Sequence, residues 1–475
     1  MTSQPQPQRQ LGKEQIRVIM VGLMVAMFPG ALDATIIGPA LPTIGRDLGD
    51  VGNLAWVATA YLLVSTAVTP LYGKLSDIHG RRIMLLIAIA VFAFGSLLCA
   101  LAPTTILLAL ARGVQALGGG GLVSLAMTVI GDVVPPRERP RYQVYTSVMW
   151  TTASLLGPVA GGYFAERWNW TVIFWINLPI CLAAWLMTDS KLRGLPRNER
   201  PHKLDYAGAA LIVLASGLLQ LTLSWGGAHY AWSSATILSM TAATIFFTAL
   251  FVWRLATAEE PLIPYRLLSN KVILFGATSV GATMAMYVAL TIYVPVFLES
   301  VRGFSASRAG LALLPLTLCS TIGAVGAGRA MLFVRRYKFV ALFGQAMAAA
   351  ALTPVFFHPV DMSMTEFEFL LGLVAVGCGA VFPITTVSIQ NSVQRHDLGT
   401  AMSLITFSRN LGAAGGVALF GVVVASLPPA SAGMAAVGET FRYVFLLGAA
   451  GFVLGFALLL FMDERSLTGA SGQMK

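Results

Sequence analysis

The chain alternates between long apolar stretches and short polar connections over almost its whole length. A helix needs about 20 apolar residues to cross the hydrocarbon core of a bilayer, and stretches of that length recur throughout the sequence. This pattern predicts an all-α integral membrane protein with fourteen transmembrane helices. The predicted spans cover residues 16–38, 52–72, 82–102, 105–130, 141–165, 170–188, 205–226, 235–256, 271–298, 308–328, 337–357, 367–391, 398–425 and 441–462.

The distribution of positive charge supports this number of spans. If the N-terminus is cytoplasmic, 24 of the 31 Lys and Arg residues fall on the cytoplasmic side, as the positive-inside rule requires. A miscounted span would have mixed the two sides. The sequence therefore predicts a multi-pass protein of the cell (plasma or inner) membrane with both termini in the cytoplasm. The net charge of +10 is interpreted as a topology signal and not as a surface for nucleic acid.

Composition excludes an ordinary soluble protein. Hydrophobic residues make up 56% of the chain and charged residues only 11%, whereas charged residues alone reach roughly a quarter of soluble domains. The sequence contains no Gly-x-x-x-x-Gly-Lys-Ser/Thr phosphate loop, and its five histidines are scattered. We therefore expect no enzymatic activity, no metal and no cofactor. ATP is excluded as the energy source, and if the protein transports a solute we expect the proton to be its coupling ion.

Similar segments recur along the chain at offsets of 253 to 259 residues. Gly113–Gly120 resembles Gly372–Gly379, and Leu156–Gly162 resembles Leu411–Gly416. Duplicated six-helix halves are typical of transporters, whose binding site lies between the halves. The predicted domains are a cytoplasmic tail at 1–15, a six-helix domain at 16–190, a linker at 191–204, two additional central helices at 205–256, a linker at 257–270, a six-helix domain at 271–462 and a cytoplasmic tail at 463–475.

Asp33 is the only carboxylate that falls inside the hydrocarbon part of a predicted span. A lone ionisable group there is costly and usually marks an ion or substrate pathway. Arg112 lies several residues inside the fourth span and needs a polar partner for the same reason. Asp33 is its candidate functional partner, and Asp132 and Asp77 are structural alternatives near the cytoplasmic face. We predict proton coupling at Asp33, with Arg112 as its candidate partner.

The connection between the second and third spans combines glycines with charges of both signs. Charge-assisted hydrogen bonds from such a loop can close one end of a helix bundle and break when the bundle rocks. The alternative is a loop that carries positive charge for topology alone, which explains neither the acid nor the glycines. The candidate gate residues are Gly73, Asp77, Gly80, Arg81, Arg82 and, at the end of the fourth span, Asp132.

The fifth span contains the segment Gly157-Pro158-Val159-Ala160-Gly161-Gly162. Proline removes a backbone hydrogen bond and bends a helix, whereas glycine allows a neighbouring helix to approach closely. Taken alone, the segment is at least as well explained by a kink that serves helix packing as by a functional motif.

Several aromatic, amide and basic side chains inside the spans line a substrate cavity, pack in the bundle or belong to the interfacial belt. These residues are Tyr61, Gln115, Trp150, Tyr287, Tyr293, Asn391 and Arg409. Arg409 raises the same question as Arg112 but has no acid nearby in the sequence. Three roles are open to it: reaching the membrane interface, bracing backbone carbonyls, or holding an anionic group.

Taken together, these motifs resemble those of the major facilitator superfamily, and specifically its fourteen-span drug:proton antiporter family. The similarity covers about residues 15–465 and rests on Leu32–Pro42, Gly73–Arg82, Arg112–Gly120, Gly157–Gly162 and the region from Gly399 to Gly412. The resemblance implies two six-helix halves with two inserted central helices. It implies that Asp33 binds the proton and that Arg112 takes part in its transfer. It also implies that Asp77 and Arg81 control the cytoplasmic gate, and that the fifth-span motif marks an exporter.

We therefore expect a proton-coupled secondary transporter that exports small amphiphilic molecules or drugs by alternating access. The alternatives are a proton-coupled symporter or importer, and a lipid-handling or sensing membrane protein on the same fold. The expected partners are a small amphiphilic substrate, protons and membrane lipids, without nucleic acid, and we expect a monomer. The two central helices should be dispensable for the proton step, because Asp205 and Arg254 near their ends are their only charged residues.

Overall fold

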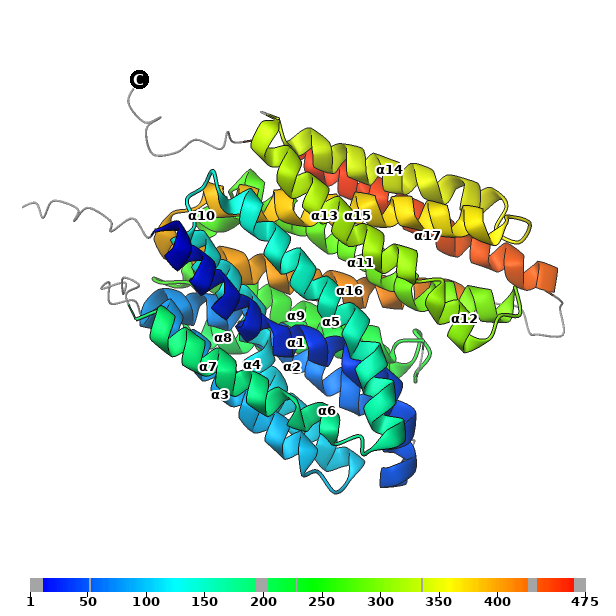
Figure 1. Cartoon of the computed structure of the whole chain (residues 1–475), viewed down its shortest axis with the longest axis horizontal. Coiled ribbons are helices and arrows are strands. Elements are labelled where there is room, and N and C mark those ends of the chain that lie inside the picture. Colours follow the sequence, from blue (N-terminus) through cyan, green and yellow to red (C-terminus); the bar gives the residue numbers. More distant parts are fainter. Residues whose placement is uncertain are drawn as a thin grey trace, which may run out of the picture.

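The computed structural model describes residues 12–50, 53–193, 204–227, 229–334, 336–425 and 434–464, and these ranges contain no β-strand. The helices form one elongated bundle (Figure 1). In chain order they are α1 (Lys13–Leu48), α2 (Ala55–His79), α3 (Arg81–Ala100), α4 (Thr105–Val133), α5 (Arg139–Arg167), α6 (Val172–Trp175), α7 (Asn177–Lys191), α8 (Tyr206–Trp225), α9 (Ala235–Thr257), α10 (Tyr265–Leu268), α11 (Lys271–Ser300), α12 (Ala306–Leu311), α13 (Leu314–Phe333), α14 (Lys338–Phe357), α15 (Met364–Ser392), the 3₁₀ turn η1 (Arg395–Asp397), α16 (Leu398–Ala425) and α17 (Met434–Phe461).

Each of the fourteen predicted spans corresponds to a long helix or to a pair of helices. The spans predicted at 170–188 and 308–328 are each divided, into α6 with α7 and α12 with α13. Among the described residues, thirteen helical segments are long and apolar enough to cross a membrane. The fourteenth, α5, has sufficient length but is more polar. It packs between α1 and α13, where Gln143 and Thr146 are buried against protein.

The long helices pack as two groups. In the first group α4 packs against α2 and α3, and α1 packs against α5 and α7. In the second group α15 packs against α13 and α14, and α11 packs against α16 and α17. The groups meet where α16 contacts α2 and α4, and where α5 contacts α13.

The two ends of the bundle differ in how close the groups lie. We call the end where α1 begins and α17 finishes the terminal end, and the opposite end the far end. The two groups lie close together toward the terminal end and diverge toward the far end, where α6 and α12 are well separated (Figure 1). The two groups therefore approach each other most closely at the terminal end.

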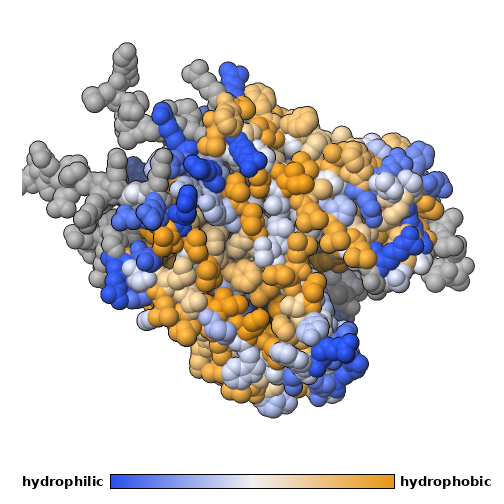
Figure 2. Space-filling model, viewed as in Figure 1, coloured by the Kyte–Doolittle hydropathy of each residue, from blue (hydrophilic) through white to orange (hydrophobic). Residues whose placement is uncertain are grey.

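Apolar side chains cover much of the outer surface. Figure 2 shows a broad hydrophobic band across one face, with hydrophilic residues gathered toward its two ends. Large side chains such as Phe94, Leu110, Phe246 and Phe343 are more than half exposed. Soluble monomers rarely expose continuous apolar areas of this extent. Together with the apolar helices, the band identifies a multi-pass membrane protein.

The inserted helices α8 and α9 pack against each other beside the two groups. Helix α8 contacts both α2 and α16, whereas α9 buries few of its side chains. Asp205 accepts a hydrogen bond of 3.0 Å from the backbone N–H of Gly208 and another of 3.0 Å from Arg254, so it joins the start of α8 to the end of α9. The two helices therefore lie along the seam between the groups and not within either group.

Candidate functional site

Asp33 and Arg112 form a buried ion pair between α1 and α4. The Nη1 atom of Arg112 lies 2.6 Å from Oδ2 and 2.8 Å from Oδ1 of Asp33. Each side chain is only 1% exposed. The structure thus brings together the two residues that the sequence suggested for proton coupling. Asp77 and Asp132, the alternative partners of Arg112, instead contact Arg81.

Gln115 and Tyr61 complete the ion-pair cluster, which we define as Asp33, Tyr61, Arg112 and Gln115. Three residues after Arg112 on the same face of α4, Gln115 donates from Nε2 to Oδ1 of Asp33 at 3.0 Å. Its Oε1 accepts a 2.6 Å hydrogen bond from Arg112. The guanidinium of Arg112 lies 4.3 Å from the ring centroid of Tyr61. Tyr61 and Gln115 are therefore enclosed with the ion pair and do not lie on an open cavity wall.

Helix α3 closes the ion-pair cluster from one side. Its close approach to α4 requires a glycine at position 95, because a Cβ atom there would overlap the backbone of Gln115. Ser96 consequently accepts a 2.8 Å hydrogen bond from Gln115 and a 3.4 Å hydrogen bond from Asn177 of α7. A chain of polar groups thus continues from Asp33 to α7.

Burial and the neighbouring side chains act in opposite directions on the charge of Asp33. Desolvation disfavours the negative charge of Asp33, whereas Arg112 and the hydrogen bond from Gln115 favour it. These opposing effects are both large at a buried site. Its contacts with Arg112 and Gln115 therefore hold the charge of Asp33 inside the bundle.

Helix α5 supports α1 directly after Asp33. Gly157 and Gly161 face α1, where an added Cβ atom would overlap its backbone or side chains. Pro158 is exposed on another side of α5, and Gly162 has its nearest non-local atom 3.9 Å from the position of an added Cβ. Gly157 and Gly161 thus pack tightly against α1, whereas Gly162 lies near Pro39 of α1 with room for a methyl group and Pro158 is exposed.

This division predicts opposite effects for two neighbouring substitutions. Gly161→Ala should lower the thermal stability of the purified protein, because overpacking costs about 1–3 kcal/mol. Gly162→Ala should be neutral or slightly stabilising, because alanine is favoured over glycine in a helix by about 1 kcal/mol and the site has room. Unfolding temperatures in detergent measure both effects. Equal changes in the two variants would contradict the packing described here.

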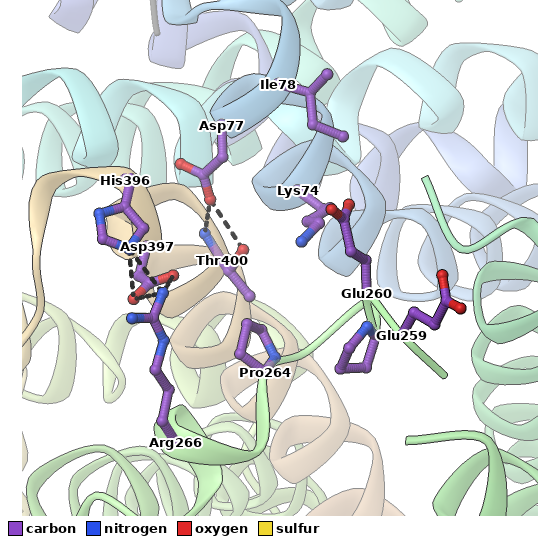
Figure 3. A pocket seen from close by; sticks show the side chains of 11 residues that line it. Lys74, Asp77, Ile78, Glu259, Glu260, Pro264, Arg266, His396, Asp397 and Thr400 are labelled. Carbon is purple, nitrogen blue, oxygen red and sulfur yellow. Dashed lines mark hydrogen bonds and ion pairs between the residues drawn. The ribbon is translucent and has the colours of Figure 1, made fainter. Parts of the chain in front are cut away.

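At the terminal end, Asp77 of α2 binds the first turn of α16 across the two groups. Its carboxylate accepts hydrogen bonds from the backbone N–H groups of Gly399 and Thr400, at 3.1 and 3.0 Å, and from the Thr400 hydroxyl at 2.9 Å. Figure 3 shows Asp77 pointing toward Thr400. A carboxylate at a helix N-terminus also interacts favourably with the helix dipole. Asp77 therefore ties the second group to the first.

Arg81 extends this contact to Asp132 and Arg395. Its Nη1 lies 2.5 Å from Asp77 and its Nε lies 3.0 Å from Asp132. Arg395 of η1 reaches Asp132 from the second group at 3.2 Å, and its carbonyl accepts a 3.1 Å hydrogen bond from Arg81. We define Asp77, Arg81, Asp132, Arg395 and Thr400 as the gate cluster. The sequence suggested three of these residues.

A second contact between the groups was not suggested by the sequence. Arg139, at the start of α5, donates to the carbonyl of Gln390 at 2.8 Å and to Oδ1 of Asn391. Gln390 in turn donates to the carbonyl of Met127 at 3.0 Å. In the sequence Arg139 was one of several positive residues in a cytoplasmic connection, and nothing distinguished it. Asn391, a candidate cavity residue, therefore takes part in closing the terminal end.

The three remaining candidate gate residues, Gly73, Gly80 and Arg82, have different roles in the packing. Gly73 lies where α2 approaches α16 so closely that a Cβ atom would overlap Ser403 and the carbonyl of Gly399. Gly80 adopts φ 92° between α2 and α3, a value that favours glycine. Arg82 pairs with Asp189 of α7, within the first group. Gly73 thus permits contact between the groups, whereas Arg82 does not participate in it.

The remaining candidate cavity residues lie in separate surroundings. The hydroxyl of Tyr293 donates to the carbonyl of Val417 at 3.0 Å, within the second group. Tyr287 is half-buried on α11, and Trp150 has a buried Nε1 without a hydrogen-bond partner. The guanidinium of Arg409 lies 5.0 Å from the ring centroid of Phe382. The structure does not gather the seven candidates around one pocket.

A pocket of about 210 Å³ lies beside the gate cluster (Figure 3). It is lined by α2, by the segment between α9 and α10, and by the start of α16. Arg266 also lines the pocket. Its Nη2 lies 2.8 Å from Oδ1 of Asp397 and 2.6 Å from Nε2 of His396. Within the described part of the chain, no group of three or more His, Cys, Asp and Glu side chains is arranged to hold a metal ion.

Comparisons with known proteins agree with this architecture. Residues 23–417 match the sequence profile of the Major Facilitator Superfamily. The chain is 33% identical to the multidrug transporter protein MdtP of Bacillus subtilis (strain 168), over 87% of this chain and 76% of that protein. It is 32% identical to the efflux pump FUS6 of Gibberella fujikuroi, over 88% of this chain and 77% of the pump. The proton:xylose symporter XylE shares the fold, with a TM-score of 0.67 and 14% identity over 97% of this chain and 98% of XylE.

Proposed function

Because the chain belongs to the Major Facilitator Superfamily, and is thus a transporter and not an enzyme, we propose that it exports small amphiphilic molecules or drugs in exchange for protons. The names of its multidrug and efflux relatives support this class of substrate and this direction. The observation that carries proton coupling is the buried ion pair of Asp33 with Arg112. A carboxylate inside a membrane span is costly, and its ionisation is then normally part of the function.

We place the terminal end of the bundle in the cytoplasm. The excess of Lys and Arg in the connections at this end supports that orientation. The gate cluster and the contacts of Arg139 join the two groups at this end. The hydrogen bond between Thr151 and Thr321, further along the bundle, also joins them. In this orientation the protein is closed to the cytoplasm and adopts an outward-facing state.

In the proposed cycle, the ion-pair cluster and the gate cluster respond to each other through α4. A proton from outside binds Asp33, weakens its attraction to Arg112 and favours the inward-facing state. Release of that proton to the cytoplasm accompanies outward movement of the substrate. Helix α4 carries both Arg112 and Asp132, twenty residues apart and thus about 30 Å along the helix, so one rigid element contacts both clusters.

Everted membrane vesicles with an acidic lumen test the direction of transport. We expect substrate to accumulate in the lumen and the pH gradient to decrease when a substrate is added from outside. The probes are amphiphilic dyes of different charge: cationic ethidium, neutral N-phenyl-1-naphthylamine and anionic 8-anilinonaphthalene-1-sulfonate. Vesicles without the protein and vesicles treated with a proton ionophore are the controls.

Other outcomes of the vesicle experiment support the alternative functions. An importer that couples by symport would move dye out of the acidic lumen together with protons. A lipid-handling or sensing protein would move none of the dyes and would leave the pH gradient unchanged. Either result would overturn the proposed antiport.

A further inference from the structure

Arg409 is a cation at mid-depth of the bundle without a negative partner. It lies eleven residues after the start of α16 at Leu398 and sixteen before its end at Ala425. Its side chain is half-buried, and its guanidinium lies over the ring of Phe382 on α15, 5.0 Å from the centroid. Within the described residues it makes no hydrogen bond and no ion pair. Arg112, the other arginine inside a span, is by contrast fully paired with Asp33.

Two of the three roles that the sequence left open for Arg409 do not fit its position. With a rise of 1.5 Å per residue, Arg409 is about 16 Å from the terminal end, which is too far for its side chain to reach the membrane interface. No backbone carbonyl within the described chain accepts a hydrogen bond from it. The remaining role is to hold an anionic group. The second half offers no competing acid at this depth, because its carboxylates lie only near helix ends or in connections.

The neighbours of Arg409 on α16 fix the direction of its side chain. The hydroxyl of Ser408 donates to the carbonyl of Ala277 on α11 at 2.7 Å, and Gly412 packs against the backbone of α11 at Gly281. Arg409 is turned away from this contact, toward Phe382 of α15. Helix α15 also contacts α5 of the first group. Arg409 and Phe382 therefore lie between α16 and α15, two helices of the second group that both contact the first group.

Trp150 is a second unpartnered hydrogen-bond donor at the same depth. It lies eleven residues after the start of α5 at Arg139, and its buried Nε1 has no acceptor. Phe382 lies ten residues before the end of α15 at Ser392. Its distance from the terminal end therefore matches those of Arg409 and Trp150 to within about 1.5 Å, the rise of one residue in a helix. An indole N–H and a guanidinium can only donate hydrogen bonds. Both groups of helices thus present a donor at mid-depth without a matching acceptor.

We propose that Arg409 binds an acidic group of the transported molecule, so that amphiphilic anions are among the substrates. This inference rests on the proposed export function and specifies its substrate class. The guanidinium matches the two oxygens of a carboxylate, sulfonate or phosphate. The ring of Phe382 provides an aromatic surface for the body of the substrate. Substrate binding then supplies the negative partner that Arg409 lacks in this state.

A matched pair of dyes tests this proposal in proteoliposomes with an imposed proton gradient. The anionic dye 8-anilinonaphthalene-1-sulfonate and the neutral dye N-phenyl-1-naphthylamine share the same aromatic skeleton and differ by the sulfonate. Arg409→Gln should lower transport of the sulfonate at least tenfold and change transport of the neutral dye less than threefold. Arg409→Lys keeps the charge and should retain intermediate transport of the sulfonate.

Arg308→Gln is the control for the loss of an arginine that stacks on an aromatic ring. Its guanidinium lies 4.1 Å from the centroid of Phe304, but the side chain is exposed near the far end. It should leave the transport ratio of the two dyes unchanged. If Arg409→Gln leaves the ratio unchanged, or if the wild type moves only the neutral dye, the anion site is wrong while export stands. If the wild type moves neither dye under the gradient, the export function on which the site depends is also wrong.

Discussion

Asp33→Asn is expected to abolish transport driven by a proton gradient while the protein remains folded in the membrane. Asparagine keeps the shape of the side chain and an oxygen that accepts from Arg112, but it does not ionise between pH 5 and 8. Breaking a buried ion pair costs about 3–5 kcal/mol when the remaining charge is left bare. The cost should be smaller here, because Arg112 retains the carbonyl of Val57, Gln115 and the ring of Tyr61.

The measurement is dye transport in proteoliposomes at a fixed pH gradient, together with the unfolding temperature of each purified variant. Asp33→Glu keeps a carboxylate and should recover part of the transport. Asp189→Asn is the matched control, since Asp189 pairs with Arg82 and Arg193 outside the ion-pair cluster. It should retain transport near the wild-type rate. Wild-type transport by Asp33→Asn at the same gradient would show that Asp33 is structural.

Asp77→Asn is expected to shift the protein from the outward-facing toward the inward-facing state. The substitution removes the charge that Arg81 contacts at 2.5 Å and places an amide against the N–H groups of Gly399 and Thr400. Hydrogen bonds to charged groups contribute about 1.5–3 kcal/mol. Because about 1.4 kcal/mol corresponds to a factor of ten, the ratio of the two states should change at least tenfold.

Cysteine labelling from the cytoplasmic side measures this shift, after Cys99, Cys181, Cys319 and Cys378 are replaced. Ser403→Cys is a suitable reporter, because Ser403 is 1% exposed where α16 meets α2. Its labelling should increase in the Asp77→Asn background. Labelling of the exposed Ser269→Cys at the same end should not change. Unchanged labelling of Ser403→Cys together with impaired transport would mean that Asp77 acts in folding or proton transfer and not in closing the gate.

The major facilitator fold and the pairing of Asp33 with Arg112 could both be predicted from the sequence. The number of membrane spans is strongly indicated by two features. Each span needs about 20 apolar residues, and Lys and Arg gather in the cytoplasmic connections. Asp33 is the only acid inside a predicted span, so it is the only intramembrane acid available to Arg112. For Gln115 the sequence leaves cavity lining and packing open, because only the close approach of α3 at Gly95 encloses its side chain.

The contacts between the two halves were harder to predict. Asp77 binds backbone N–H groups at the start of α16, more than 300 residues later, and backbone donors leave no trace in residue type. Arg139 binds carbonyl groups and was indistinguishable from a topology signal for the same reason. The polar character of α5 was visible in the sequence. The sequence did not show that these polar side chains are buried against protein, because this depends on the position of α5 between α1 and α13.

Proton release from the purified protein in weakly buffered detergent solution tests the central claim most directly. Antiport through Asp33 requires that substrate binding favours release of the proton from Asp33. Adding a transported dye to the wild-type protein, equilibrated at a pH where Asp33 is protonated, should therefore acidify the solution. Asp33→Asn, which binds no proton at this position, should bind the dye without releasing protons. Equal proton release by the wild type and Asp33→Asn would contradict proton coupling through Asp33.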